Sequence, residues 1–105
     1  MIASPRIHIP DVEIESFCRR WHVVELSLFG SVLREDFRPD SDVDVLVTFA
    51  QGARPSLFDM VGMQEELGAI LGREVDLVER KAVEQSENYI RRKRILRDLA
   101  PVYVA

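Results

Sequence analysis

Three aspartates lie in segments whose other residues favour buried strands. Asp42 and Asp44 are separated by one valine at the start of an apolar run, and Asp76 interrupts the apolar run of residues 74–78. Because side chains alternate along a strand, Asp42 and Asp44 point to the same face, with Cα atoms about 6.6–6.8 Å apart. If the two strands are neighbours, three carboxylates meet at one point of the sheet.

Carboxylates gathered in this way repel each other, by about 4 kcal/mol per pair at 4 Å and an effective dielectric constant near 20. Either their pKa values rise or a cation lies among them. Oxygen ligands select hard ions, so the sequence predicts a Mg²⁺ or Mn²⁺ site at Asp42, Asp44 and Asp76. In the alternative interpretation, Asp42 belongs to a solvated turn and Asp76 faces water at a strand edge.

A second group of residues is suited to binding phosphate. Gly30 and Ser31 follow the apolar run of residues 23–29. A glycine, which has no Cβ, followed by a serine at a helix start lets backbone N–H groups approach an anion. Arg34 can add a positive charge for a phosphate oxygen. The alternative is an ordinary strand-to-helix turn with Ser31 as the N-cap.

The elements that must position these residues follow from the spacing of apolar side chains and from turn residues. A helix should begin near Asp11, and a second should be capped by Ser56 and closed by Gly72. We further expect strands at 23–29, 43–49 and 74–78, a helical turn through residue 34, a turn at 37–41, a last helix at 86–99, and a weak edge strand at 102–104.

Strands separated by helices predict an α/β domain with a small mixed β-sheet flanked by helices. The short connection between strands 23–29 and 43–49 favours antiparallel pairing. Strand 74–78 follows a full helix and is expected to lie parallel to 43–49 through a right-handed crossover. Strand 43–49 is nearly all apolar after residue 44, so it should be central and covered on both faces.

Length and composition limit the class of protein. The 105 residues suit one domain, residues 1–105, and the formal charge of −4 argues against a protein that coats nucleic acid. The lone Cys18 excludes an internal disulfide and is expected in the core. No stretch approaches the ~18 apolar residues of a membrane span, and the first ten residues carry no export signal. We therefore expect a cytoplasmic domain.

The predicted last helix is strongly basic. Five of its seven residues from 91 to 97 are positively charged: Arg91, Arg92, Lys93, Arg94 and Arg97. This run could dock an acidic partner or reach RNA, although direct nucleic-acid binding is not favoured. The alternative is a solvated basic face behind apolar residues.

Together these features resemble the nucleotidyltransferases of the DNA polymerase beta superfamily. The shared pattern is a hydrophobic strand with Gly-Ser, then Asp-x-Asp, then a distant third aspartate on a strand, at residues 28–34, 41–47 and 75–78. The resemblance covers about residues 23–103. It is nearest to the minimal nucleotidyltransferase (MNT) domains of prokaryotic toxin–antitoxin pairs, and it implies a polymerase beta-like fold and a single minimal nucleotidyltransferase domain.

The resemblance also implies an enzyme that transfers AMP from ATP to a tyrosine hydroxyl of a partner HEPN ribonuclease toxin, using two Mg²⁺ ions, with Mn²⁺ as the alternative metal. By this analogy Asp42 and Asp44 hold both ions, and Asp76 holds the ion on the nucleophile side. Gly30 and Ser31 bind the triphosphate, and Arg34 matches a basic position frequent in the family.

Two other functions stay open at this point. One is a non-catalytic antitoxin that neutralises the toxin by covering it. The other is a nucleotidyltransferase that acts on a small molecule or on RNA. The toxin's Arg-x₄₋₆-His motif is absent from the chain, so membership in such a pair would place the chain on the antitoxin side.

Overall fold

The computed structural model describes residues 7–34, 37–38 and 40–105. Helical segments separate its strands, as the sequence predicts. In chain order they are α1 (Asp11–Arg20), β1 (Val23–Phe29), the 3₁₀ turn η1 (Gly30–Leu33), β2 (Val43–Phe49), α2 (Leu57–Leu71), β3 (Val75–Glu79), α3 (Arg80–Glu84), α4 (Tyr89–Arg97) and β4 (Ala100–Val104).

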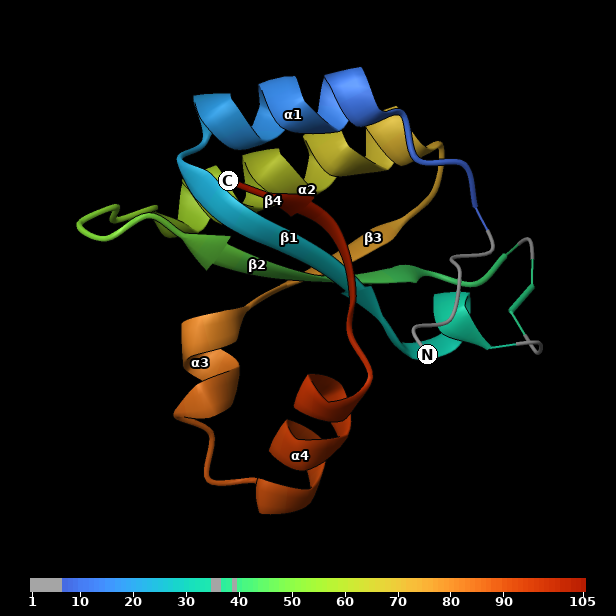
Figure 1. Ribbon diagram of the computed structural model, residues 1–105, viewed down its shortest axis with the longest axis vertical. Coiled ribbons are helices and arrows are strands. Elements are labelled where there is room, and N and C mark those ends of the chain that lie inside the picture. Colours follow the sequence, from blue (N-terminus) through green and yellow to red (C-terminus); the bar gives the residue numbers. More distant parts are fainter. Residues whose placement is uncertain (1–6, 35–36, 39) are drawn as a thin grey trace.

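The strands form one mixed sheet in the order β3-β2-β1-β4. β1 pairs antiparallel with β2 and with β4, whereas β2 and β3 are parallel. Helices cover both faces: α1 and α2 lie on one side, and α3 and α4 on the other (Figure 1). The predicted fold class, the two pairings of the central strand and the edge strand at the chain end are confirmed.

The core is divided by the sheet into two unequal clusters. The larger cluster joins α1 and α2 to the valines of β2, and the smaller consists of Phe29, Leu46, Val83 and Ile95. Val43, Val45 and Val47 of β2 are fully buried in the larger cluster, and Leu46 is buried in the smaller. β2 is thus covered on both faces, as predicted. Asp44 shares the strand face of Leu46, which is the face covered by α3 and α4.

Local signals at the ends of α2 are confirmed. The Ser56 hydroxyl accepts a hydrogen bond from the Asp59 N–H at 3.0 Å, and the Ser56 N–H donates to the Asp59 carboxylate at 2.8 Å. This reciprocal pair is a capping box. Gly72 ends the helix in the left-handed conformation, with φ of 68°, which a glycine adopts without steric cost.

The end of the chain differs from the prediction. The helix predicted at 86–99 is shorter in the structure, where α4 covers Tyr89–Arg97, and the short helix α3 (Arg80–Glu84), which was not predicted, precedes it. Asn88 starts α4, because its side-chain oxygen accepts a hydrogen bond from the Arg91 N–H at 3.1 Å. Five residues are too few for α3 to show a helical period.

Smaller differences concern element boundaries. β3 begins and ends one residue later than predicted, and β4 begins at Ala100 rather than at residue 102. The turn predicted at 37–41 includes Pro39, which lies outside the described residues. Beside it, the Ser41 N–H donates to the Arg38 carbonyl at 3.0 Å, which is consistent with a turn. Across the described ranges, none of the helices has the length and apolarity needed to cross a membrane.

Candidate active site

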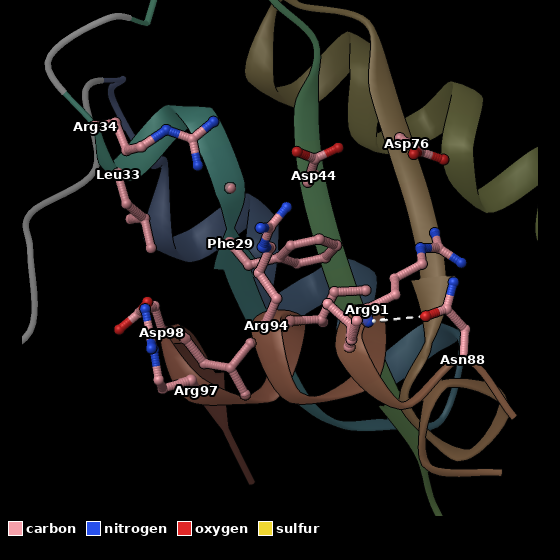
Figure 2. A pocket seen from close by; sticks show the side chains of 14 residues that line it. Phe29, Leu33, Arg34, Asp44, Asp76, Asn88, Arg91, Arg94, Arg97 and Asp98 are labelled. Atoms are coloured by element: carbon pink, nitrogen blue, oxygen red, sulfur yellow. Dashed lines mark hydrogen bonds and ion pairs between the residues drawn. The ribbon is translucent and has the colours of Figure 1, made fainter. Parts of the chain in front are cut away.

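Asp44 and Asp76 lie side by side on the sheet face covered by α4. They are direct partners in the parallel pairing of β2 and β3. Both line a pocket of about 960 Å³ between the sheet and α4 (Figure 2). Asp44 is half-buried and Asp76 is exposed. Of the three carboxylates that the sequence predicts to meet at one point of the sheet, the structure thus places Asp44 and Asp76 on neighbouring strands.

Gly30 provides the space that the Asp44 carboxylate occupies. Its backbone has φ of +77°, and a Cβ atom at this position would lie 2.3 Å from Asp44 Oδ2. β1 and β2 bring the two residues together, because Phe29 pairs with Asp44 at the end of β1. The need for glycine thus has a cause that the sequence did not indicate: any side chain here would displace the carboxylate.

The electrostatics of the site oppose the charged form of Asp44. Burial raises the pKa of its carboxyl, and the neighbouring charges of Asp76 and Asp42 raise it further. Arg34 and Arg91 act in the opposite direction, but the net effect is an increase. A cation at this point would relieve the repulsion. Two adjacent carboxylates are also suitable ligands for a hard divalent ion, so the residues present fit the predicted metal.

The structure gathers some of the predicted site residues and not others. Gly30, Arg34, Asp44 and Asp76 line the same pocket, whereas Asp42 and Ser31 are not among its lining residues. Asp42 is exposed just before β2 begins. Within the described ranges, no three His, Cys, Asp or Glu side chains are placed to hold a metal ion. The metal-binding role of Asp42, Asp44 and Asp76 and the phosphate-binding role of Gly30, Ser31 and Arg34 stay predictions.

Sequence reasoning missed the basic side of this pocket. Three arginines of α4, spaced three residues apart, line it opposite the aspartates: Arg91, Arg94 and Arg97. The sequence singled out the charge run but did not show which of its residues face the sheet. The signal that could have found them is the three-residue spacing, which places side chains on one face of a helix.

Cys18 is not among the residues that line this pocket. It is buried in the cluster on the other side of the sheet, as predicted for a core residue. Burial raises the pKa of its thiol to about 12. The thiolate, which is the form that attacks or binds metal, is therefore suppressed at neutral pH.

Comparison with known proteins identifies related sequences. The model of the nucleotidyltransferase domain family matches residues 13–99. Protein adenylyltransferase MntA of Thermococcus cleftensis is 46% identical over 59 residues, which are 56% of this chain and 58% of that protein. A relative from Methanocaldococcus jannaschii is 43% identical over 56 residues, again 58% of its length. The chain thus spans little more than half the length of the curated relatives that it matches.

Solved structures share the fold. A candidate minimal nucleotidyltransferase is 33% identical, with a TM-score of 0.65 and 87% of each chain covered. A chain of a toxin–antitoxin structure with AMP-PNP has a TM-score of 0.68 at 17% identity, covering 91% of this chain and 74% of that one. A chain of a tri-AMPylated Shewanella oneidensis HEPN toxin in complex with MNT antitoxin gives 0.61 at 18% identity, with 90% and 70% covered.

Proposed function

The chain belongs to the nucleotidyltransferase domain family, and from this premise we propose that it transfers AMP from ATP to a tyrosine hydroxyl of a partner HEPN ribonuclease toxin, which it thereby neutralises. The observation that carries the proposal is the pair Asp44 and Asp76, which lie on adjacent strands at one pocket with Gly30 against the first of them. The similarity to MntA and the shared fold of the MNT–HEPN complex support the choice of acceptor.

The proposed cofactor is a pair of Mg²⁺ ions, with Mn²⁺ as the alternative. Asp44 and Asp76 would hold them, and the exposed Asp42, two residues before Asp44, would complete the ligand set. When bound, the metals stabilise the charge on the attacking and leaving oxygens of an in-line displacement. The raised pKa of Asp44 supports this assignment, since a divalent cation would offset the repulsion between the carboxylates.

The residues of the chain have separate tasks in the proposed reaction. The tyrosine oxygen forms a bond to the α-phosphorus, the bond to the bridging oxygen breaks, and pyrophosphate leaves. Asp76, exposed at the pocket, would help remove the proton of the attacking hydroxyl. Gly30 and Ser31 would bind the triphosphate, and Arg34, which also lines the pocket, would add positive charge beside it.

The direct test is transfer of labelled AMP. Wild-type protein is incubated with labelled ATP, Mg²⁺ and the HEPN toxin of the proposed pair, and label is expected on a tyrosine of that toxin. Mutation of residues that only orient metal ligands typically lowers metal affinity or activity about 10–100-fold. Asp44 is itself a proposed ligand, so Asp44→Asn should lower the transfer rate by at least about 100-fold. Asp11→Asn removes the same charge from the first turn of α1, on the other face of the sheet, and should leave transfer unchanged.

Two outcomes would contradict the proposal. One is the absence of label transfer with the wild-type protein. The other is an Asp44→Asn variant that still neutralises the toxin fully in cells, which would show that binding without catalysis is sufficient. Activity on a free small molecule or an RNA end, with no activity on the HEPN protein, would identify a different acceptor.

A further inference from the structure

Two arginines of α4 face the aspartates across the pocket. Arg91 and Arg94 both line it, and their side chains extend from α4 toward the strands that carry Asp44 and Asp76 (Figure 2). The charge of Arg91 acts directly on Asp44. The pocket therefore has Asp44 and Asp76 on its sheet wall and Arg91 and Arg94 on its α4 wall, while Arg34 and Asp98 also line it.

Other basic residues of the same helix are engaged elsewhere. Arg92 donates to the Ser86 carbonyl at 3.0 Å and lies 5.5 Å from the centre of the Tyr89 ring. Lys93 lies 5.8 Å from the same ring, and Arg97 contacts Asp98 at 3.3 Å. Over the described part of the chain, the guanidinium groups of Arg91 and Arg94 form no ion pair. These two arginines are thus available for an anionic ligand.

The combination of charges restricts the class of ligand. An acidic peptide would satisfy the arginines but would be repelled by the two aspartates beside them. A polyphosphate that carries a divalent cation satisfies both walls, because the cation meets the carboxylates and the phosphate oxygens meet the arginines. The forked guanidinium binds phosphate oxygens through two parallel hydrogen bonds. A pocket of about 960 Å³ lies within the usual range for sites of this kind.

We propose that Arg91 and Arg94 bind the β- and γ-phosphates of the nucleoside triphosphate, so that α4 holds the pyrophosphate that leaves. The assignment rests on the proposed function and adds to it a phosphate-binding wall separate from the Gly30-Ser31 turn. Ile95 of the same helix is buried in the smaller core cluster with Phe29 and Leu46, and it anchors this wall to the sheet.

The test compares nucleotides that differ in these two phosphates. Isothermal titration calorimetry measures the affinity for ATP and for AMP, each with Mg²⁺, in wild type, Arg91→Ala and Arg94→Ala. Each substitution should weaken ATP binding about tenfold and AMP binding by less than about twofold, since a charge-assisted hydrogen bond is lost only with ATP. Lys93→Ala removes the same charge from α4 without touching the pocket and should change neither affinity.

The outcomes separate this inference from the function on which it rests. Equal weakening of ATP and AMP, or an effect of Lys93→Ala as large as that of Arg91→Ala, would overturn the phosphate assignment alone. Unchanged ATP affinity with slower transfer to the HEPN protein would also overturn it, and would assign the arginines to the protein partner. Failure of the wild-type protein to bind any nucleoside triphosphate would instead contradict the proposed function.

Discussion

At the scale of single residues, the absence of a side chain at Gly30 determines where the Asp44 carboxylate can lie. The missing Cβ of Gly30 leaves the space in which Asp44 Oδ2 lies, and the positive φ of +77° is a conformation that L side chains rarely adopt. The carboxylate is therefore held against backbone, which cannot yield as a flexible side chain would. Gly30 can in this way control the position of a carboxylate on the neighbouring strand.

Gly30→Ala tests this dependence, with Gly72→Ala as the matched control. Both glycines have positive φ, but a Cβ at Gly72 would meet nothing within 4 Å. Each substitution should lower the free energy of unfolding by about 1–2 kcal/mol through backbone strain. Only Gly30→Ala should also displace the Asp44 carboxylate, and a misplacement near 1 Å can lower a rate about 100-fold.

Denaturant unfolding and labelled AMP transfer measure the two effects separately. If Gly30→Ala loses stability but keeps the wild-type transfer rate, the position of the Asp44 carboxylate does not depend on Gly30. If Gly72→Ala loses transfer to the same extent, the loss comes from stability and not from the site.

At the scale of elements, α4 is the part of the site with the weakest attachment. Only Ile95 of this helix is buried, whereas β2 supplies four buried residues. Among the described residues, the smaller cluster that holds α4 has four buried members, against thirteen in the cluster that includes α1 and α2. The aspartates are thus fixed to the rigid sheet, and the arginines to a helix that packs through few contacts.

Ile95→Ala and Met63→Ala separate local from global destabilisation. Both side chains are buried, on opposite faces of the sheet. Each truncation should lower the free energy of unfolding by about 2–5 kcal/mol. Ile95→Ala should in addition weaken ATP binding, because it loosens the helix that carries Arg91 and Arg94. Met63→Ala should leave the ATP affinity of the folded protein near that of wild type.

Calorimetric titration with ATP at a temperature where both variants are folded measures the difference. If the alanine variants do not fold, Ile95→Val, with an expected loss of about 0.5–1.5 kcal/mol, replaces Ile95→Ala. Equal ATP affinity in the Ile95 and Met63 variants would show that the packing of α4 does not position the phosphate-binding residues.

At the scale of the whole molecule, net charge conceals an arrangement of opposite charges. The chain carries 14 basic and 18 acidic residues, and seven of the basic ones lie between residues 80 and 97. Part of this basic segment faces two aspartates across the pocket. The net charge of −4 therefore describes neither wall of the pocket. Because arginines of α4 line the pocket, this net charge is weak evidence against an anionic ligand there.

Metal and nucleotide should stabilise the whole fold by mass action. Mg²⁺ alone should raise the unfolding midpoint, because it offsets the repulsion between Asp44 and Asp76. At a free concentration of 100 Kd, Mg·ATP should add about 2.7 kcal/mol, a shift on the order of 10 °C for a domain of this size. Differential scanning calorimetry with and without EDTA measures both effects.

Asp44→Asn is the control for this stabilisation. Without the metal it should unfold at the same or a higher temperature than wild type, since a half-buried carboxylate facing like charges is removed. Its response to Mg²⁺ should be strongly reduced. An equal Mg²⁺ shift in Asp44→Asn and wild type would mean that the metal binds elsewhere.

The sequence by itself determined most of the fold and the centre of the site. The boundaries of β1, β2 and α2, the capping box at Ser56 and the parallel pairing that joins Asp44 to Asp76 all follow from local patterns. Side-chain periodicity, cap residues and connection lengths act over a few residues, so they can be read directly from the chain.

Only the tertiary structure decided what surrounds the two aspartates. It shortened the predicted last helix to Tyr89–Arg97 behind the cap at Asn88, left Asp42 outside the pocket lining, placed the Asp44 carboxylate against Gly30, and turned Arg91 and Arg94 toward the sheet. These features depend on contacts between residues far apart in the chain, such as Ile95 with Leu46 in the smaller cluster. A run of five basic residues shows that a helix is charged, but its packing on the sheet selects which charges face the pocket.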